Sequence, residues 1–397
     1  MLKIEEYREV APPGAVDMAL RLAERLRGRR FLHVSGGRLG TGPAEILRAA
    51  LPILTDMGVE TGWEITGGDP SYYATARALS AALEGAERTL RPEALAHWVE
   101  MNRLSGRKLT LDADLVLVHD VPPASLVEAR KAGRWVWRCH LDCSRPEHRA
   151  WLFFREFVER YDAVVVSLPG YGPGVAIPQY VIQPSIDPLS DKNRGLPASE
   201  IATILHGLGV ARDKPLLVQV GALARSADLT GLVNSYRLVK RHHDVRLVLA
   251  GTTRGGPDRA EARASLEEAT ARDPDIVVVE LPPEAHRQIN ALQRAATIVL
   301  QTEESEGFEL GAAEAMWKGK PVIGRATTEA LRQLIIPDVT GYLVRSVEGA
   351  AFRMRQLLNN PELIPRMGAA GREHVRRAFL ITRHLVDYLA LMIHLGR

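Results

Sequence analysis

Short apolar runs alternate with amphipathic stretches along the first half of the chain. Residues 15–28 and 44–57 place apolar side chains at helical spacing, which predicts two helices. Five apolar runs predict strands, at residues 31–34, 61–65, 115–118, 135–137 and 163–167. Runs of this kind, apolar on both faces, are typical of a parallel sheet that helices cover on two sides.

The same alternation starts again after residue 200. Further strands are expected at residues 216–220, 245–251, 276–279, 298–301 and 321–323, with helical segments between them. A Pro-containing stretch, 184–194, separates the two series, and a last helix is expected over 381–395. The pattern therefore predicts an α/β protein with two successive doubly wound parallel sheets. Ligands of such sheets bind at the carboxyl ends of the strands, which favours a site in a cleft between the two domains.

Composition and charge restrict the class of protein. The chain has 397 residues, 46% of them hydrophobic and 25% charged, as in an ordinary globular protein of two domains. A net charge of +3 with interspersed signs does not favour nucleic acid as a partner. No apolar run reaches membrane-spanning length and the N-terminus does not resemble a signal peptide, so we expect a cytoplasmic protein without a membrane partner. Cys139 and Cys143 lie outside any metal-ligand spacing and are interpreted as reduced, partly buried thiols.

Two carboxylates dominate the most informative segment, residues 305–324. Glu306 lies in a Gly-containing loop, and Glu314 follows eight positions later on the predicted helix, about 12 Å along one helical path. A buried carboxylate such as Glu314 needs partners, which a ribose diol or a structural salt bridge would provide. Glu306 is explained either by a ligand or by an N-cap.

Other candidate residues follow predicted strands. The Gly-rich turn Gly40-Thr41-Gly42 precedes a helix and offers backbone N–H groups to an anion, although a plain tight turn explains it as well. Two His and Asp pairs end the apolar runs at 115–118 and 135–137, where either a binding site or a polar core cluster would be expected; they are His119 with Asp120 and His140 with Asp142. A turn at residues 67–73 adds Asp69 and Tyr72 as candidates for lining the same pocket.

These motifs resemble those of the family-4 retaining glycosyltransferases, whose donor-site motif is E-G-F-G-x(4)-E. Near-collinear similarity covers almost the whole chain and is closest to the branch of trehalose glycosyltransferring synthases, in segments such as Val118-His119-Asp120 and residues 137–142 and 184–190. The resemblance implies the GT-B fold, with two Rossmann-like domains. It further implies an acceptor domain (1–187), a donor domain (188–372) and a C-terminal helix that packs back on the first domain (373–397).

The same resemblance implies an activity and a set of roles. A nucleoside-diphosphate glucose would donate glucose to a small sugar, with retention and without a metal or another cofactor. With glucose as the acceptor, the product would be trehalose. Glu306 and Arg225 would be catalytic; the donor would contact Gly40, Thr41, Gly42, Glu306, Gly307, Phe308, Glu309, Leu310 and Glu314. The acceptor would contact His119, Asp120, His140, Asp142, Asp69 and Tyr72. A homodimer is compatible with the sequence.

Three departures from the family pattern concern the donor site, its phosphates and its sugar. The family's Arg and Lys after the first strand of the donor domain become Ala222 and Ala227 in an ungapped alignment, or Arg225 and Thr230 in a shifted one. The lysine is lost in both alignments. Glu309 replaces a family glycine, and Thr327-Thr328 replaces a Gly-Gly pair. Two alternatives therefore stay open: a non-catalytic paralogue that binds a sugar or a partner, and a phosphorylase-like enzyme with a changed donor.

Overall fold

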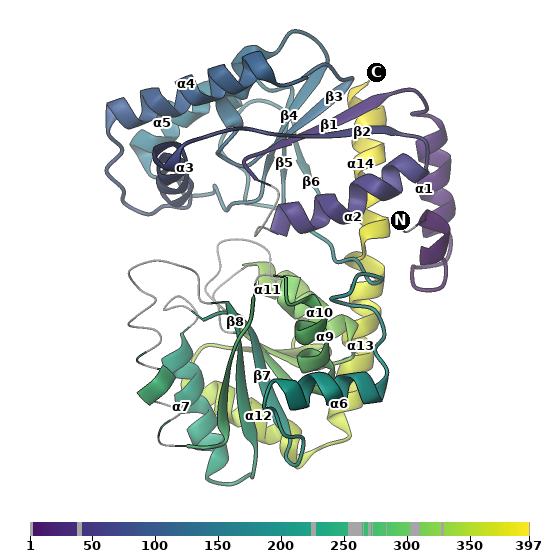
Figure 1. Ribbon diagram of the computed structural model, residues 1–397, viewed down its shortest axis with the longest axis vertical. Helices are drawn as coiled ribbons and strands as arrows, with labels where there is room; N and C mark the ends of the chain where they lie inside the picture. Colours follow the sequence, from purple (N-terminus) through teal and green to yellow (C-terminus); the bar gives the residue numbers. More distant parts are fainter. Residues whose placement is uncertain are drawn as a thin grey trace. The chain divides into compact units, whose positions relative to one another are not determined.

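The computed structural model divides the chain into two compact units, coloured along the sequence in Figure 1. The first unit comprises Met1–Ser185 together with Ile381–Arg397, and the second comprises Ile186–Leu380. The structure describes residues 3–37, 42–223, 228–252, 264, 266–268, 271, 273–282, 284–301, 310–326 and 329–396. Each unit is built on one six-stranded sheet in which every strand pair is parallel.

The sheet of the first unit has the strand order β2-β1-β3-β4-β5-β6. Its strands are β1 (Arg30–Ser35), β2 (Glu60–Ile65), β3 (Leu115–His119), β4 (Arg134–Cys139), β5 (Ala163–Val166) and β6 (Gln179–Val181). The order reverses after β2, so right-handed crossovers place α2 on one face and α3 to α5 on the other. The helices of this unit are η1 (Ile4–Tyr7), α1 (Ala15–Glu24), α2 (Gly42–Asp56), α3 (Pro70–Leu83), α4 (Pro92–Lys108), η2 (Ala124–Ala129), α5 (His148–Val158) and α14 (Ile381–Leu395).

Helix α14 is part of the first unit although it is the last element of the chain. It packs against α1 and α2 and crosses one face of the sheet, as Figure 1 shows. The contact buries Tyr388 and Leu389, and the ring of Tyr388 meets Phe31 of β1 edge-on at 5.7 Å between centroids. Burying such aromatic and aliphatic side chains stabilises the unit by about 1.5–3 kcal/mol each.

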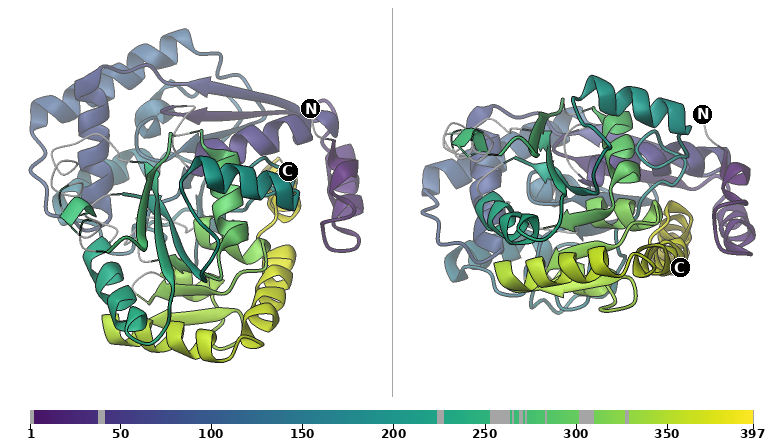
Figure 2. Two further views of the ribbon diagram at one scale, coloured as in Figure 1. Left: turned by 60° about the horizontal axis from the view of Figure 1, so that its bottom comes forward. Right: turned by 90° about the horizontal axis from the view of Figure 1, so that it is seen from below.

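The second unit repeats the architecture with the order β12-β11-β10-β7-β8-β9. Its strands are β7 (Leu216–Ala222), β8 (Arg246–Thr252), β9 (Ile276–Glu280), β10 (Ile298–Gln301), β11 (Val322–Arg325) and β12 (Gly341–Val344). Its helices are α6 (Ala198–Gly207), α7 (Leu229–Lys240), α9 (His286–Ala295), α10 (Leu310–Trp317), α11 (Glu329–Leu334), α12 (Val347–Asn359) and α13 (Leu363–Ala378). Helix α7 packs on α12, α6 on α9 and α10 on α13 (Figure 2). The prediction of two parallel-sheet α/β domains is confirmed.

Three details of the sequence prediction were wrong. Residues 67–73 do not form a turn throughout, because Pro70 begins α3: Asp69 caps this helix by accepting from the N–H of Tyr72 at 2.8 Å, and proline suits the first helical position. The second boundary, at 372/373, falls inside α13, whereas the chain changes unit only after Leu380. Strands β6 and β12 were not predicted.

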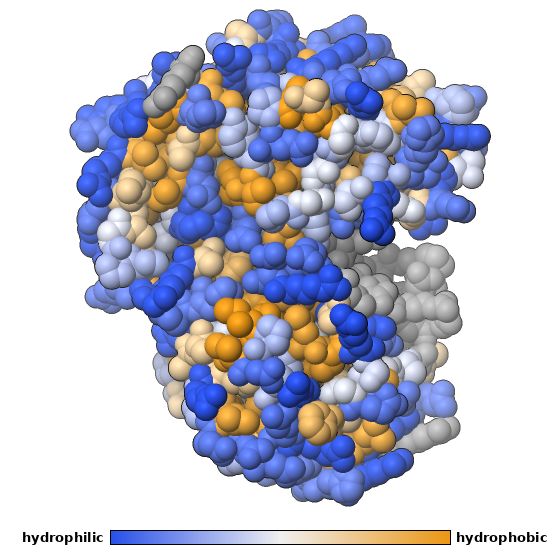
Figure 3. Space-filling view, turned by 180° about the vertical axis from the view of Figure 1, so that it is seen from behind, coloured by the Kyte–Doolittle hydropathy of each residue, from blue (hydrophilic) through white to orange (hydrophobic). Residues whose placement is uncertain are grey.

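The surface visible in Figure 3 is mixed. Hydrophobic residues form separate groups among hydrophilic ones on this face. Within the described residues, no helix is both long enough and apolar enough to cross a membrane.

Candidate functional site

Asp120 and His140 lie together at the carboxyl edge of the first sheet. His119, the last residue of β3, pairs with Arg138 of β4, so the chain leaves the two neighbouring strands at the same level. Asp120 has a φ of 58°, its N–H donates to the Arg138 carbonyl (2.9 Å), and its Oδ1 accepts from the N–H of His140 (2.9 Å). Non-glycine residues hold positive φ only where their surroundings compensate the strain, and such residues are common at functional sites.

A chain of three imidazoles runs into the sheet from this edge. His33 of β1 bonds to His119 through Nδ1 and Nε2 (2.9 Å), and His119 Nδ1 bonds to His140 Nε2 (3.3 Å). Burial lowers the pKa of His33 to about 3 and holds the pKa values of His119 and His140 well below their usual range. The three rings are therefore neutral at physiological pH, because a buried cation loses its hydration.

Burial acts on Asp120 in the opposite sense. It raises the pKa of this carboxyl to about 6, against the hydrogen bond from His140 and the charge of Arg138, which lower it. The edge thus presents a carboxyl whose pKa lies near 6, beside an imidazole that is neutral. Such a pair can bind hydroxyl groups without attracting a strong anion.

The other predicted acceptor residues occupy different surroundings. Asp142 is partly exposed, and its Oδ1 accepts from the N–H of Ser144 (3.0 Å). Asp69 caps α3, and its Oδ2 is hydrogen-bonded to Nε2 of His97 at the surface (2.9 Å). Tyr72 is fully buried in α3 and its hydroxyl donates to the Pro122 carbonyl (2.6 Å), so in this structure it is a core residue that no ligand reaches.

The two cysteines lie just behind the same edge. Cys139 and Cys143 are free and fully buried, with 3.5 Å between their Sγ atoms, so they are more buried than the sequence suggested. Burial and the neighbouring thiol raise the pKa of Cys139 well above its usual value. Because the thiolate is the reactive form, these thiols are expected to be inert packing groups.

In the second unit, Glu314 lies on α10 and is only 3% exposed. Its Oε1 pairs with Nζ of Lys192 at 3.0 Å, and the Lys192 side chain is 17% exposed. The partner comes from the 184–194 stretch, 122 positions earlier in the sequence. The salt bridge that the sequence left open as an alternative is therefore present.

Lys318, one helical turn after Glu314, holds together the residues next to the Lys192–Glu314 pair. Its Nζ donates to Asn193 Oδ1 (2.8 Å), to Gln293 Oε1 (2.7 Å) and to the Glu314 carbonyl (3.2 Å). Burial lowers the pKa of Lys318 to about 7, although the carboxylate of Glu314 counteracts the shift. Sequence reasoning missed both lysines, since only the fold brings residues 192, 193, 293 and 318 together.

The remaining predicted donor residues are largely outside the described part of the chain. Gly42 begins α2 and Leu310 begins α10 with a half-buried side chain. Those outside the described residues are Gly40, Thr41, Arg225, Glu306, Gly307, Phe308 and Glu309.

Near the altered phosphate clamp, the structure describes one ion pair and one exposed side chain. Arg325, at the end of β11, pairs with Asp228 through Nη1 and Oδ2 (2.8 Å), and Asp228 caps α7 by accepting from the N–H of Gly231 (3.1 Å). Thr230, the clamp-lysine position in the shifted alignment, is exposed in the first turn of α7. Arg325 is thus a cation at this carboxyl edge, but it is already paired with a carboxylate.

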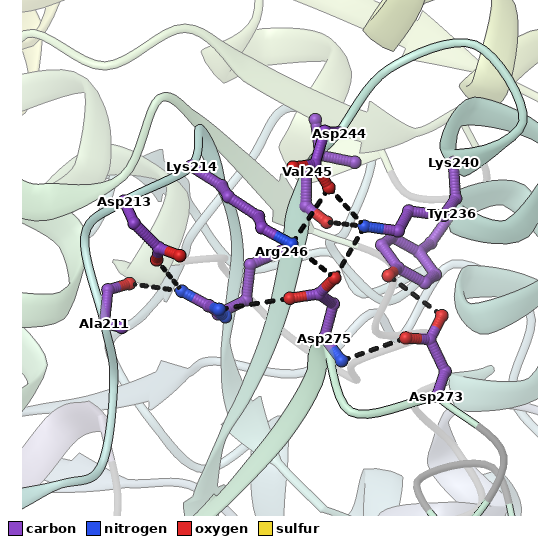
Figure 4. Close-up of polar contacts among 10 residues, drawn as sticks. All are labelled: Ala211, Asp213, Lys214, Tyr236, Lys240, Asp244, Val245, Arg246, Asp273 and Asp275. Atoms are coloured by element: carbon purple, nitrogen blue, oxygen red, sulfur yellow. Dashed lines mark hydrogen bonds and ion pairs between the residues drawn. The ribbon is translucent and has the colours of Figure 1, made fainter.

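A second charged cluster lies at the opposite, amino end of this sheet (Figure 4). Asp275, just before β9, accepts from Lys214 (2.8 Å), Lys240 (2.6 Å) and Arg246 (3.1 Å). The hydrogen bonds from the two lysines lower the pKa of Asp275 to about 2. Because both oxygens of Asp275 are engaged and ligands of parallel sheets bind at the other end of the strands, this cluster is interpreted as structural.

Comparison with known proteins identifies the family. The family description "Trehalose synthase, N-terminal domain" matches residues 33–173, and "Glycosyl transferases group 1" matches residues 202–374. The chain is 37% identical to a trehalose synthase of Pyrococcus horikoshii, covering 99% of this chain and 97% of the relative, and 34% identical to that of Rubrobacter xylanophilus over similar shares. The chain belongs to the trehalose synthase family.

More distant comparisons agree on the fold of this trehalose synthase family member. A solved structure titled "Trehalose-6-phosphate from E. coli bound with UDP-2-fluoro glucose" superposes with a TM-score of 0.74 at 14% identity, covering 91% of this chain and 98% of that one. A sucrose-phosphate synthase of Thermosynechococcus elongatus superposes with a TM-score of 0.71 at 18% identity, over 92% and 99%. These structures agree on the fold, and with the family match over residues 202–374 they identify the protein as a glycosyltransferase of the GT-B type.

Proposed function

We propose that the protein transfers glucose from a nucleoside-diphosphate glucose to glucose and forms trehalose with retention. The observation that carries this proposal is the similarity to trehalose synthases over nearly the whole chain, in both domains. Full-length similarity matters because the proposed site residues come from both halves of the chain. The proposal also fits the edge of the first sheet, where the Asp120 carboxyl lies beside the neutral imidazole of His140.

On the acceptor side, Asp120 would accept hydrogen bonds from sugar hydroxyls while its backbone is held by Arg138 and His140. Rigid placement matters for transfer, because a correctly oriented acceptor makes the reaction effectively unimolecular. A neutral imidazole beside the carboxyl suits an uncharged sugar better than an anionic one.

On the donor side, Glu314 would accept from the two ribose hydroxyls and the backbone around Gly40 to Gly42 would hold the diphosphate. In the transfer, an acceptor hydroxyl attacks the anomeric carbon on the face that the nucleoside diphosphate leaves. The bond from that carbon to the diphosphate oxygen breaks, and the hydroxyl proton passes to the departing phosphate. Glu306 would stabilise the positive charge that develops on the sugar, and the reaction involves no metal or other cofactor.

The altered clamp predicts a weakened donor site. One desolvated cation at a charge-developing site typically contributes about 10²–10³ in rate. Arg325 is engaged with Asp228, so it would replace the lysine only if the diphosphate displaced that carboxylate. Reduced turnover, rather than a different reaction, is the expected consequence.

The test is a thermal-shift titration with nucleotides, nucleoside-diphosphate glucoses, glucose 1-phosphate and free sugars, followed by product analysis. A ligand at 100 times its dissociation constant adds about 2.7 kcal/mol to stability, which a melting curve resolves. We expect a nucleoside-diphosphate glucose to stabilise the protein and, with glucose present, to yield trehalose and nucleoside diphosphate in equal amounts.

Two other results would each exclude the proposal. Stabilisation by glucose 1-phosphate, with trehalose formed from it but not from nucleotide sugars, would identify a phosphorylase-type reaction. Trehalose phosphorylases are more distant relatives, at 25% identity for that of Pleurotus pulmonarius, of which this chain covers 58%. Sugar binding without any product would identify a non-catalytic paralogue.

A further inference from the structure

The imidazole chain of the first unit is placed by strand register. His33 of β1 pairs with Leu117 of β3, and His119 lies two residues further along β3. In turn, His119 pairs with Arg138 of β4, and His140 lies two residues beyond it. Because side chains two residues apart share a face, the three histidines form a diagonal on one face of the sheet. The diagonal rises from the core to the carboxyl edge.

Neutral rings in such a chain must all carry the same tautomer. Each neutral imidazole has one N–H and one bare nitrogen, so each of the two bonds needs a donor and an acceptor. If His33 donates from Nδ1, then His119 and His140 also carry their protons on Nδ1. If His33 instead accepts, all three carry them on Nε2. The tautomer of His140 at the edge therefore depends on the tautomer of His33 at the buried end of the three imidazoles.

The buried end decides between these two arrangements. Nε2 of His33 is buried and has no hydrogen-bond partner among the described residues. It is left as an unpaired N–H in one arrangement and as an unpaired lone pair in the other, and buried unpaired N–H groups are the rarer defect.

A fourth histidine in the same core, His384, has a buried Nε2 that is likewise left without a hydrogen-bond partner among the described residues. Nδ1 of His384, on α14, is hydrogen-bonded to the carbonyl of Gln183 at 3.0 Å. The ring centroid of Tyr388 lies 4.4 Å from that of His384 and 5.6 Å from that of His33. A carbonyl only accepts, so Nδ1 of neutral His384 carries the proton. Its Nε2 is then a bare lone pair, buried and without a partner in the described part of the chain.

We propose that His33 and His119 are positioning residues that hold His140 in the Nδ1–H tautomer, so that His140 donates a hydrogen bond to an oxygen of a bound sugar. Nε2 of His140 accepts from His119, and Nδ1 is the ring nitrogen left for a ligand. With Asp120 as the acceptor beside it, the edge offers one donor and one acceptor to a hydroxylated ligand. The role toward a sugar rests on the proposed function, whereas the tautomer is a property of the free protein.

The first test measures the tautomer without any substrate. Histidine ring nitrogens labelled with ¹⁵N resonate in separate regions when protonated and when bare, and a His140→Gln variant identifies the His140 signals. We expect a protonated Nδ1 and a bare Nε2 on His140 in the wild-type protein at neutral pH. A protonated Nε2, or a doubly protonated ring, would overturn the proposal whatever happens in the activity assay.

The second test asks whether His119 sets this state. His119→Leu removes the donor to His140 and should add an Nε2–H population, whereas His119→Gln, whose amide can both accept and donate, should retain the Nδ1–H form. In a transferase assay, His119→Leu should raise KM for the acceptor sugar about tenfold, the loss of one hydrogen bond, with a smaller change for His119→Gln. An unchanged tautomer in His119→Leu would refute the positioning role.

Controls separate these outcomes from misfolding and from failure of the proposed function. His206→Leu, at an exposed position in the other unit, should leave the His140 signals unchanged. Should no sugar be transferred by the wild-type protein, the proposed function fails, while the tautomer measurement in His119→Leu still decides whether His119 positions His140.

Discussion

Glu314 provides the sharpest test of the donor site, because the structure gives it one role and the proposed function gives it another. Its carboxylate is nearly fully buried against Lys192 at 3.0 Å, and it would also bind ribose. Glu314→Gln keeps the shape but removes the negative charge that faces the Lys192 ammonium. Breaking a fully buried pair costs about 3–5 kcal/mol. Since the Lys192 side chain is 17% exposed, part of this cost is relieved by water, and about 2–3 kcal/mol is expected.

Unfolding of purified variants measures this cost. For units of this size, about 2–3 kcal/mol corresponds to a fall in melting temperature of about 4–12 °C. A double-mutant cycle with Lys192→Met isolates the pair, and we expect a coupling energy of about 1–3 kcal/mol. Glu329→Gln is the matched control: Glu329 lies in the same unit in an exposed pair with Arg332, so its loss should cost under about 1 kcal/mol.

Nucleotide binding completes the experiment. If Glu314 also binds ribose, Glu314→Gln should weaken nucleotide affinity by about 1.5–3 kcal/mol, measured by calorimetry well below the melting temperature. Loss of stability with unchanged nucleotide affinity would restrict Glu314 to a structural role. An unchanged melting temperature with strongly weakened affinity would show that the pair with Lys192 contributes almost nothing to stability and would refute the expected loss.

Three further predictions concern other parts of the molecule. Thr230→Lys combined with Glu309→Gly should strengthen binding of a nucleoside-diphosphate glucose by about 1–3 kcal/mol, measured by calorimetry. Ala227→Lys with Ala222→Arg makes the same test for the ungapped alignment. Tight binding of the donor by the wild-type protein would refute the idea of a weakened clamp. Asp275→Asn should cost about 1–2 kcal/mol at pH 7, since a pKa lowered from 3.8 to about 2 corresponds to roughly 2.4 kcal/mol before screening of the partly exposed lysines. That contribution is complete above pH 3.8 and is lost as pH falls through about 2, so equal acid unfolding of variant and wild type would contradict it. Cys139 and Cys143 should resist thiol reagents in the folded protein and react only on unfolding, and rapid labelling of the native state would show the core to be more open.

The sequence predicts the two sheets well because their central strands are short apolar runs. Strand β3, for example, is buried at every position. Strand β6 was missed since it lies at the sheet edge and its three residues are exposed or half-buried, which removes the apolar signal. The turn expected around Asp69 was wrong in part because Asp-Pro also signals the start of a helix, and only the apolar spacing of the following residues distinguishes the two.

Candidate residues could be predicted from the sequence where the evidence for them lies in neighbouring residues, and not where it depends on contacts between distant parts of the chain. His119, Asp120 and His140 stand out because each follows or ends a predicted strand. His33 carries no such signal, and its link to His119 depends on a register that periodicity alone does not give. The pairing of Lys192 with Glu314 is a contact between distant parts of the chain, and a single sequence contains no pattern that would indicate it.

The two carboxyl edges differ in the kind of ligand that they can hold. In the first unit, burial keeps the imidazoles neutral and raises the pKa of the Asp120 carboxyl, so recognition there depends on the direction of hydrogen bonds. In the second unit, the described groups near the corresponding edge are charged pairs, Lys192 with Glu314 and Arg325 with Asp228. Hydrogen-bond direction distinguishes sugar hydroxyls, which carry no charge, whereas paired charges can exchange partners with a diphosphate. Under the proposed function, Asp120 and His140 would bind the uncharged acceptor, whereas Glu314 would bind the charged donor.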